Sequence, residues 1–169
     1  MGGIKLTYII LYKKSKIKQK LKSYSLKMTS LEEHKNKIKE HLEEIDDAIE
    51  EGAEKKPITI GFHCSACAIQ FLELYLHATN RIPIGKVIKH DWFKKPQKGQ
   101  RIEPLIERHL NANFPNKNEI YSLIYDLEEE RNILVYGKPA SEQIKNVLEK
   151  FLKIKKIFLE MLKNERIEL

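Results

Sequence analysis

The chain has 169 residues, which is enough for one domain with one hydrophobic core and too few for two sizeable cores. Its formal net charge of +7 points towards an anionic partner, but residues 1–27 alone contain eight lysines and no acidic residue. The remaining chain has 23 basic and 24 acidic residues and is therefore close to neutral. Overall charge does not make this chain a general nucleic-acid binder.

The N-terminal segment does not resemble a membrane span or a signal peptide. Its apolar stretch, residues 6–12, is short and is followed by lysines rather than by a cleavage site, so we expect a cytoplasmic protein without a membrane partner. Ser30 and Glu33 have the spacing of a capping box and predict a helix that begins near Ser30. Residues 1–27 are then a flexible basic tail, or they precede a true start at Met28. The functional alternative is an arm that binds RNA or a membrane surface.

The rest of the chain predicts helices. Apolar residues at helical spacing mark helices over about 31–52 and 57–78, and the second is apolar on most sides, which is typical of a central helix. Residues 81–99 contain prolines and glycines and predict a long loop. A short helix that contains Ile102, Leu105, Ile106 and Leu110 and ends near Asn113 follows, and longer helices over about 118–136 and 141–163 come after it. No segment has the alternation of a strand. We expect an all-α, up-and-down bundle of four to five helices over residues 28–169, with the long loop between the second and third.

Two cysteines in the second helix raise the question of a metal site. Cys64 and Cys67 have the spacing of two zinc ligands, but a second cysteine pair is missing, and His63, His77 or His90 would have to complete the site. Both thiols also fall on the apolar stripe, where buried cysteine is common. The sequence therefore favours buried cysteines, and we predict no metal and no cofactor.

The long loop combines cations with aromatic side chains between residues 86 and 95. This composition is used by proteins that bind phosphates and stack exposed bases. The alternative is that the aromatic side chains anchor the loop on the bundle while the lysines stay in solvent. His90 is a candidate acid–base group or a local hydrogen-bond partner. The candidate RNA-binding residues are Lys86, Lys89, Trp92, Lys94 and Lys95.

Arg131 interrupts the apolar stripe of the helix over about 118–136, at a position where the pattern requires a core residue. Its structural interpretation is an ion pair with Glu128, three residues earlier. Its functional interpretation is a clamp for a phosphate or for the charge of a phosphorane, because the planar guanidinium matches those oxygens. Spacing alone does not separate the two.

These motifs resemble the HEPN superfamily over roughly residues 31–163. The alanine-rich second helix and the proline-containing loop with His90 fit the family, and Arg131 and Asn132 begin its signature of an arginine, a polar residue and, four to six positions on, a histidine. The stretch from Arg131 to Val135 followed by Gly137 looks closest to the toxin branch of toxin–antitoxin systems. Tyr136, however, stands where the catalytic histidine belongs.

The resemblance implies a helical bundle in which two subunits bring an arginine and a histidine together to cleave RNA without a metal ion.

 Because an unperturbed tyrosine has a pKa of about 10, it is a poor general base near neutral pH, and the loss of such a group typically lowers a rate by about 10²–10⁴. Vigorous nuclease activity is therefore not predicted.

The sequence thus predicts a HEPN-like homodimer that binds RNA or a nucleotide through Arg131, Asn132 and the loop near His90. The second hypothesis is a specialised, metal-independent ribonuclease in which Tyr136 donates a proton or His90 replaces the missing imidazole. The third is a non-catalytic subunit that pairs with a small nucleotidyltransferase, in which Arg131 is merely structural.

Overall fold

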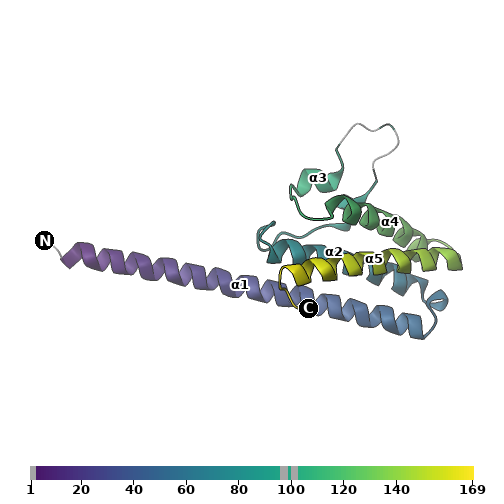
Figure 1. Ribbon diagram of the computed structural model, residues 1–169, viewed down its shortest axis with the longest axis horizontal. Coiled ribbons are helices and arrows are strands. Elements are labelled where there is room, and N and C mark those ends of the chain that lie inside the picture. Colours follow the sequence, from purple (N-terminus) through teal and green to yellow (C-terminus); the bar gives the residue numbers. More distant parts are fainter. Residues whose placement is uncertain (1–2, 96–98, 100–102) are drawn as a thin grey trace.

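The computed structural model describes residues 3–95, 99 and 103–169, with the side chains of α1 described at residues 16–19 and from residue 31 onward. Its α-helices are α1 (Gly3–Glu50), α2 (Pro57–Ala78), α3 (Leu105–His109), α4 (Lys117–Tyr136) and α5 (Ser141–Asn164), joined in part by the 3-10 turns η1 (Ala53–Lys55) and η2 (His90–Phe93) (Figure 1). No strand occurs among these described residues. The predicted all-α bundle, with its long connection after the second helix, is confirmed.

Helix α1 is longer than predicted. It is continuous through Ser30, so the expectation that the helix begins at Ser30 is wrong. Residues 3–27, which we expected as a flexible tail, continue the same helix and project beyond the bundle (Figure 1). A run of 24 residues without proline or glycine, from residue 4 to residue 27, lets the helix continue. A translation start at Met28 stays a prediction.

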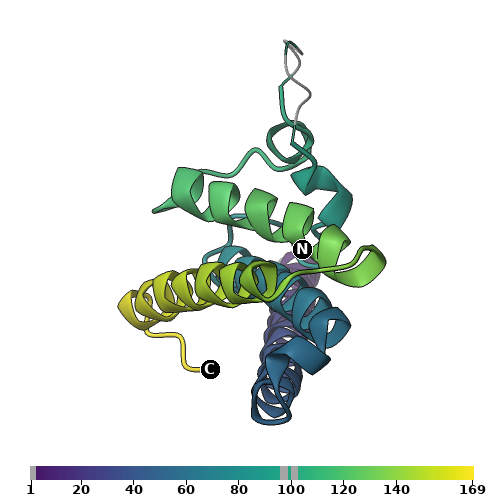
Figure 2. The same ribbon diagram turned by 90° about the vertical axis from the view of Figure 1, so that its right-hand side faces the viewer.

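Helix α2 is the central helix, as its composition predicts. It contacts α1, α4 and α5, and Figure 2 shows α1 and α4 on opposite sides of the molecule with α2 between them. Pro57 occupies its first turn, where the missing N–H has no helical partner to lose. The apolar face that the sequence predicts for this helix contains Ile60, Cys64, Cys67, Ala68, Phe71, Tyr75 and Ala78, and all of these are buried except Ala78, which is half-buried. By length and composition α2 could cross a membrane, but 67% of the relevant window is buried inside the bundle.

The crossing of α2 and α4 depends on a glycine. A Cβ atom built on Gly61 would lie 2.9 Å from the Cβ of Leu134, closer than real Cβ contacts come. The two helices therefore approach most closely at this point. This close approach, one turn before Ser65, brings the polar side chains of both helices within hydrogen-bonding distance.

Helix α5 closes the core with a continuous apolar stripe. Phe158 stacks on Phe71 with ring centroids 5.7 Å apart, and it also lies near Tyr75, at 6.5 Å. The helix ends at Asn164 and starts at Ser141, close to the predicted limits. The apolar stripe of the helix predicted over 31–52 ends in Ile49, which we expected to be buried, but Ile49 is 46% exposed near the end of α1.

Buried polar side chains of α2 fix the loop that follows it. The Ile88 N–H donates to Glu73 Oε1 (2.5 Å), and His77 Nε2 donates to the Lys86 carbonyl (3.0 Å). Glu73 is 2% exposed and also accepts a hydrogen bond from Gln70 Nε2 (3.1 Å). These bonds hold the loop against α2 just before His90 and so determine where His90 lies.

Burial of Glu73 has a measurable consequence for stability. Burial raises the pKa of its carboxyl above the usual 4.5, although the Ile88 N–H and the nearby His34 and Lys37 oppose the shift. A raised pKa in the folded state means a stabilising contribution at low pH that is lost as the pH rises from about 4.5 through the raised value. We expect Glu73→Gln, which keeps an acceptor for Ile88, to become more stable relative to wild type as the pH rises from 4 to 7.5.

Urea unfolding at both pH values measures this difference in the free energy of unfolding. Glu43→Gln, at an exposed position of α1, is the matched control and should show no comparable change. A difference for Glu73→Gln that stays constant with pH would contradict the prediction.

Candidate functional site

The buried carboxylate of Glu128 joins three elements. Glu128 lies in α4, is 7% exposed and accepts a hydrogen bond from the Ser65 hydroxyl of α2. Its Oε1 atom lies 2.6 Å from His90 Nδ1 of η2, and its Oε2 atom lies 3.2 Å from an Nη1 atom of Arg131. One carboxylate therefore holds both an imidazole and a guanidinium in place.

These contacts define how His90 is presented. Its Nδ1 atom faces Glu128 and lies 3.3 Å from Ser65 Oγ. A carboxylate can only accept, so the Nδ1–H tautomer of His90 is favoured, and Nε2 is then left with the lone pair. The side chain of His90 is 38% exposed. An imidazole oriented in this way can accept a proton from a bound molecule.

His90, Arg131 and Asn132 line one pocket of about 440 Å³ between the loop and α4. The pocket brings together three of the four predicted catalytic residues, which come from segments 41 residues apart in the sequence. The full lining is His90, Asp91, Phe93, Lys94, Lys95, Tyr125, Glu128, Glu129, Arg131 and Asn132.

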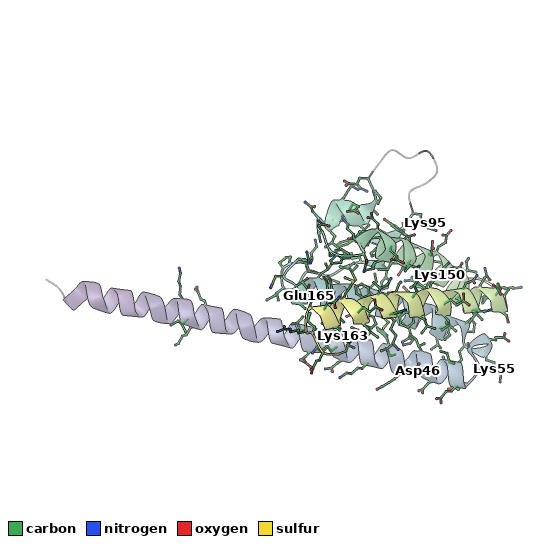
Figure 3. All side chains as sticks on the ribbon, in the orientation of Figure 1. Asp46, Lys55, Lys95, Lys150, Lys163 and Glu165 are labelled. Atoms are coloured by element: carbon green, nitrogen blue, oxygen red, sulfur yellow. The ribbon has the colours of Figure 1, made fainter. Side chains whose placement is uncertain are left out.

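The cations of the pocket are paired with carboxylates. Lys94 Nζ lies 3.0 Å from Asp91, and Lys95 Nζ lies 2.7 Å from both Asp126 and Glu129. The hydrogen bonds to Asp126 and Glu129 raise the pKa of Lys95, and the hydrogen bond to Lys94 lowers the pKa of Asp91. Asp126 is also 4.0 Å from Lys150 of α5, so charges link the loop, α4 and α5. Figure 3 labels Lys95 and Lys150.

Tyr136 does not join this site. It is 78% exposed at the end of α4 and is not among the described residues that line the pocket. The position at which the family signature carries histidine therefore lies apart from the pocket of Arg131. His90 and Arg131 line the same pocket.

The remaining candidate RNA-binding residues have mixed positions. Trp92 is 8% exposed and stacks on His109 with ring centroids 4.7 Å apart, so it anchors the loop and its ring is not open to a base. Lys86 lies over the same indole, with Nζ 5.2 Å from the ring centroid. Lys89 is exposed just before η2. We therefore withdraw Trp92 from the candidate RNA contacts and retain the lysines.

A second histidine pair lies beside the site. His41 Nδ1 of α1 and His63 Nδ1 of α2 are 3.0 Å apart, so one ring donates to the other. Burial, followed by the charges of His63 and His90, lowers the pKa of His41. Because the charge of His90 contributes to the lowered pKa of His41, the histidine pair lies near the pocket that His90 lines.

No family model, curated protein or solved structure matches this chain. The HEPN resemblance accordingly rests on the arginine–asparagine motif, the alanine-rich helix and the histidine-containing loop described above. It stays a prediction, and the structure adds only that the regular elements among the described residues are all helical.

The two cysteines belong to the core. Cys64 and Cys67 are both fully buried and free, and burial raises the pKa of Cys67 to about 12 and that of Cys64 well above its usual value. Both thiols therefore stay protonated near neutral pH, whereas zinc is bound by thiolates.

Sequence reasoning missed the connecting residues. The sequence indicated Glu128 only as an ion-pair partner of Arg131, and it did not distinguish Ser65 from the other small residues of α2. A weak signal existed for Glu128, because it falls next to the buried Leu127 in the apolar stripe. Nothing in the local sequence marked Ser65, since its partner is 63 residues away.

Proposed function

We propose that this chain binds RNA or a nucleotide, with a phosphate held in the pocket between η2 and α4. The observation that carries the proposal is that His90, Arg131 and Asn132 line the same pocket together with Lys94 and Lys95. Guanidinium, amide, imidazole and ammonium groups are the donors that proteins use for phosphate oxygens. The volume, about 440 Å³, lies within the range of small-molecule sites.

The carboxylates in the pocket do not prevent such binding. The ion pairs of Lys94 and Lys95 involve exposed side chains, and exposed pairs contribute only about 0–1 kcal/mol each. A phosphate can replace these partners at small cost. Arg131 is 21% exposed and reaches Glu128 through Nη1, and its guanidinium carries five donors in total.

Removal of Arg131 tests the proposal. We expect Arg131→Ala to weaken the binding of a labelled mixed-sequence RNA by about 10- to 100-fold, because a charged hydrogen bond to phosphate contributes about 1.5–3 kcal/mol. Fluorescence anisotropy at several salt concentrations measures the affinity. In a plot of the logarithm of the affinity against the logarithm of the salt concentration, the magnitude of the slope should fall by about one.

The matched control is Lys145→Ala, which removes an exposed cation of α5 that pairs with Glu149. It should leave the affinity nearly unchanged, and thermal unfolding of both variants checks that they are folded. If wild-type protein binds no RNA, or binds it as well as Arg131→Ala does, the proposal is wrong.

The hydrogen bond between His90 and Glu128 favours a second candidate, metal-independent RNA cleavage. In that reaction His90 Nε2 takes the proton of a ribose 2′-hydroxyl, and the freed oxygen attacks the adjacent phosphorus. The 5′-oxygen leaves and takes a proton from water, and a 2′,3′-cyclic phosphate remains. Arg131 stabilises the added negative charge on the phosphate oxygens.

The ion pair of Arg131 with Glu128 also fits a third candidate of another class. In a non-catalytic subunit, paired with a small nucleotidyltransferase or with its own copy, this ion pair would only stabilise α4. Arg131→Ala would then lower stability without changing RNA affinity, so the same experiment separates the two classes.

A further inference from the structure

The surface of α2 beside the pocket contains an exposed aromatic ring. Phe62 is 51% exposed, although α2 is otherwise largely buried from Ile60 to His77. Its ring meets His63 edge-on at 5.1 Å and His41 edge-on at 6.4 Å. The two imidazoles hold the phenyl ring while its outer surface stays open.

The geometry of α2 directs Phe62 between α1 and α4. Gly61 and Ser65 face α4, whereas His63 faces α1. Each residue of an α-helix is rotated by about 100° from the one before it, so Phe62 points between these two directions. Further along α2 the loop packs on this helix, where the Ile88 N–H bonds to Glu73.

Phe62 is not among the residues that line the pocket, but the chain on either side of it contacts the elements that form the pocket. Ser65, one turn along α2 from Phe62, lies 3.3 Å from His90 of the pocket. Leu134, which touches Gly61, lies one turn along α4 from Arg131. The turn that carries Phe62 thus runs beside the turn that carries Arg131 and Asn132.

We propose that Phe62 is a stacking platform for a nucleobase whose phosphate lies at Arg131, with the His41–His63 pair beside it. This inference rests on the proposed function and names the part of the ligand that gives affinity beyond charge. Aromatic rings stack on any base, so the subsite recognises single-stranded RNA without strong sequence preference. A ring already held by two neighbours loses little side-chain freedom on binding.

The experiment compares two polyanions on the full chain, a short single-stranded RNA and inorganic polyphosphate, which has no bases. We expect wild-type protein to prefer RNA, and Phe62→Ala to weaken RNA binding by roughly 5- to 100-fold without changing polyphosphate binding. Arg131→Ala should weaken both. Phe62→Trp should retain RNA affinity, and RNA should quench its added fluorescence. Leu152→Ala, which removes a 57% exposed apolar side chain of α5, is the matched control.

The outcomes separate this inference from the proposed function. If Arg131→Ala weakens RNA binding and Phe62→Ala does not, the stacking subsite is wrong and phosphate binding stands. Equal wild-type affinity for RNA and polyphosphate also overturns the subsite. If neither polyanion binds, both proposals fail. Sedimentation velocity completes the test, because a change of oligomeric state in Phe62→Ala would make this face an interface between copies.

Discussion

RNA cleavage in the presence of a chelator is expected to slow by about 10²–10⁴-fold when His90 is replaced by alanine, if the oriented imidazole is the acid–base group. The expected effect follows from the orientation of His90. Its Nδ1 atom lies 2.6 Å from Glu128, so its Nε2 atom is the one that can accept a proton in the pocket that Arg131 also lines. Quantifying cleaved ends in single-turnover reactions measures the rate.

Two further variants make this prediction specific. Tyr136→Phe should have little effect, because Tyr136 is 78% exposed at the end of α4 and lies outside the pocket lining. Glu128→Gln should lower the rate and alter its pH profile, since an amide orients and charges the imidazole differently from a carboxylate. If wild-type protein does not cleave RNA, the binding function stands alone. A loss with Tyr136→Phe instead of His90→Ala would return the chemistry to the motif tyrosine.

Phe158→Ala is expected to lower the free energy of unfolding by about 3–5 kcal/mol, as large-to-small substitutions of buried phenylalanines do. Phe158 is fully buried and stacks on Phe71 of the central helix. Its removal leaves a cavity at the contact between α2 and α5, which the rigid neighbours cannot fill. Urea or thermal unfolding followed by circular dichroism measures the change.

Leu159→Ala is the matched control for this stability prediction. The two residues are adjacent in α5, but Leu159 is 41% exposed, so its truncation should cost less than about 1 kcal/mol. Equal effects of the two substitutions would mean that α5 does not pack on α2 through Phe158.

The sequence was sufficient for the helices and for most of the core. The limits of α2, α4 and α5 lie within a residue or two of their predicted positions, because proline, glycine and apolar periodicity are local signals. The same local reasoning failed at Ser30, where a capping pattern was present but the helix continued through it. A capping box can only stabilise a helix end where the preceding residues leave the helix.

The candidate site was predictable in its residues but not in its connections. Arg131, Asn132 and His90 were marked by a charge in an apolar stripe and by the family resemblance, and they line one pocket. Only the tertiary structure showed that Tyr136 is not among the residues that line the pocket and that Trp92 is buried. Residue type shows what a side chain can do, whereas the packing of distant segments decides whether it is exposed.

The sequence by itself determined the helical class, the central position of α2 and the unusual placement of Arg131. Each of these depends on the spacing of apolar and charged residues along individual helices. The ion pair of Arg131 with Glu128 spans one helical turn and was among the interpretations that the sequence offered. Only the tertiary structure decided that Ser65 and His90 join Glu128, and that Phe62 is exposed on α2. The physical reason is that these contacts cross from α2 to η2 to α4 over 25 to 63 residues. They exist because the close approach at Gly61 brings α2 and α4 together.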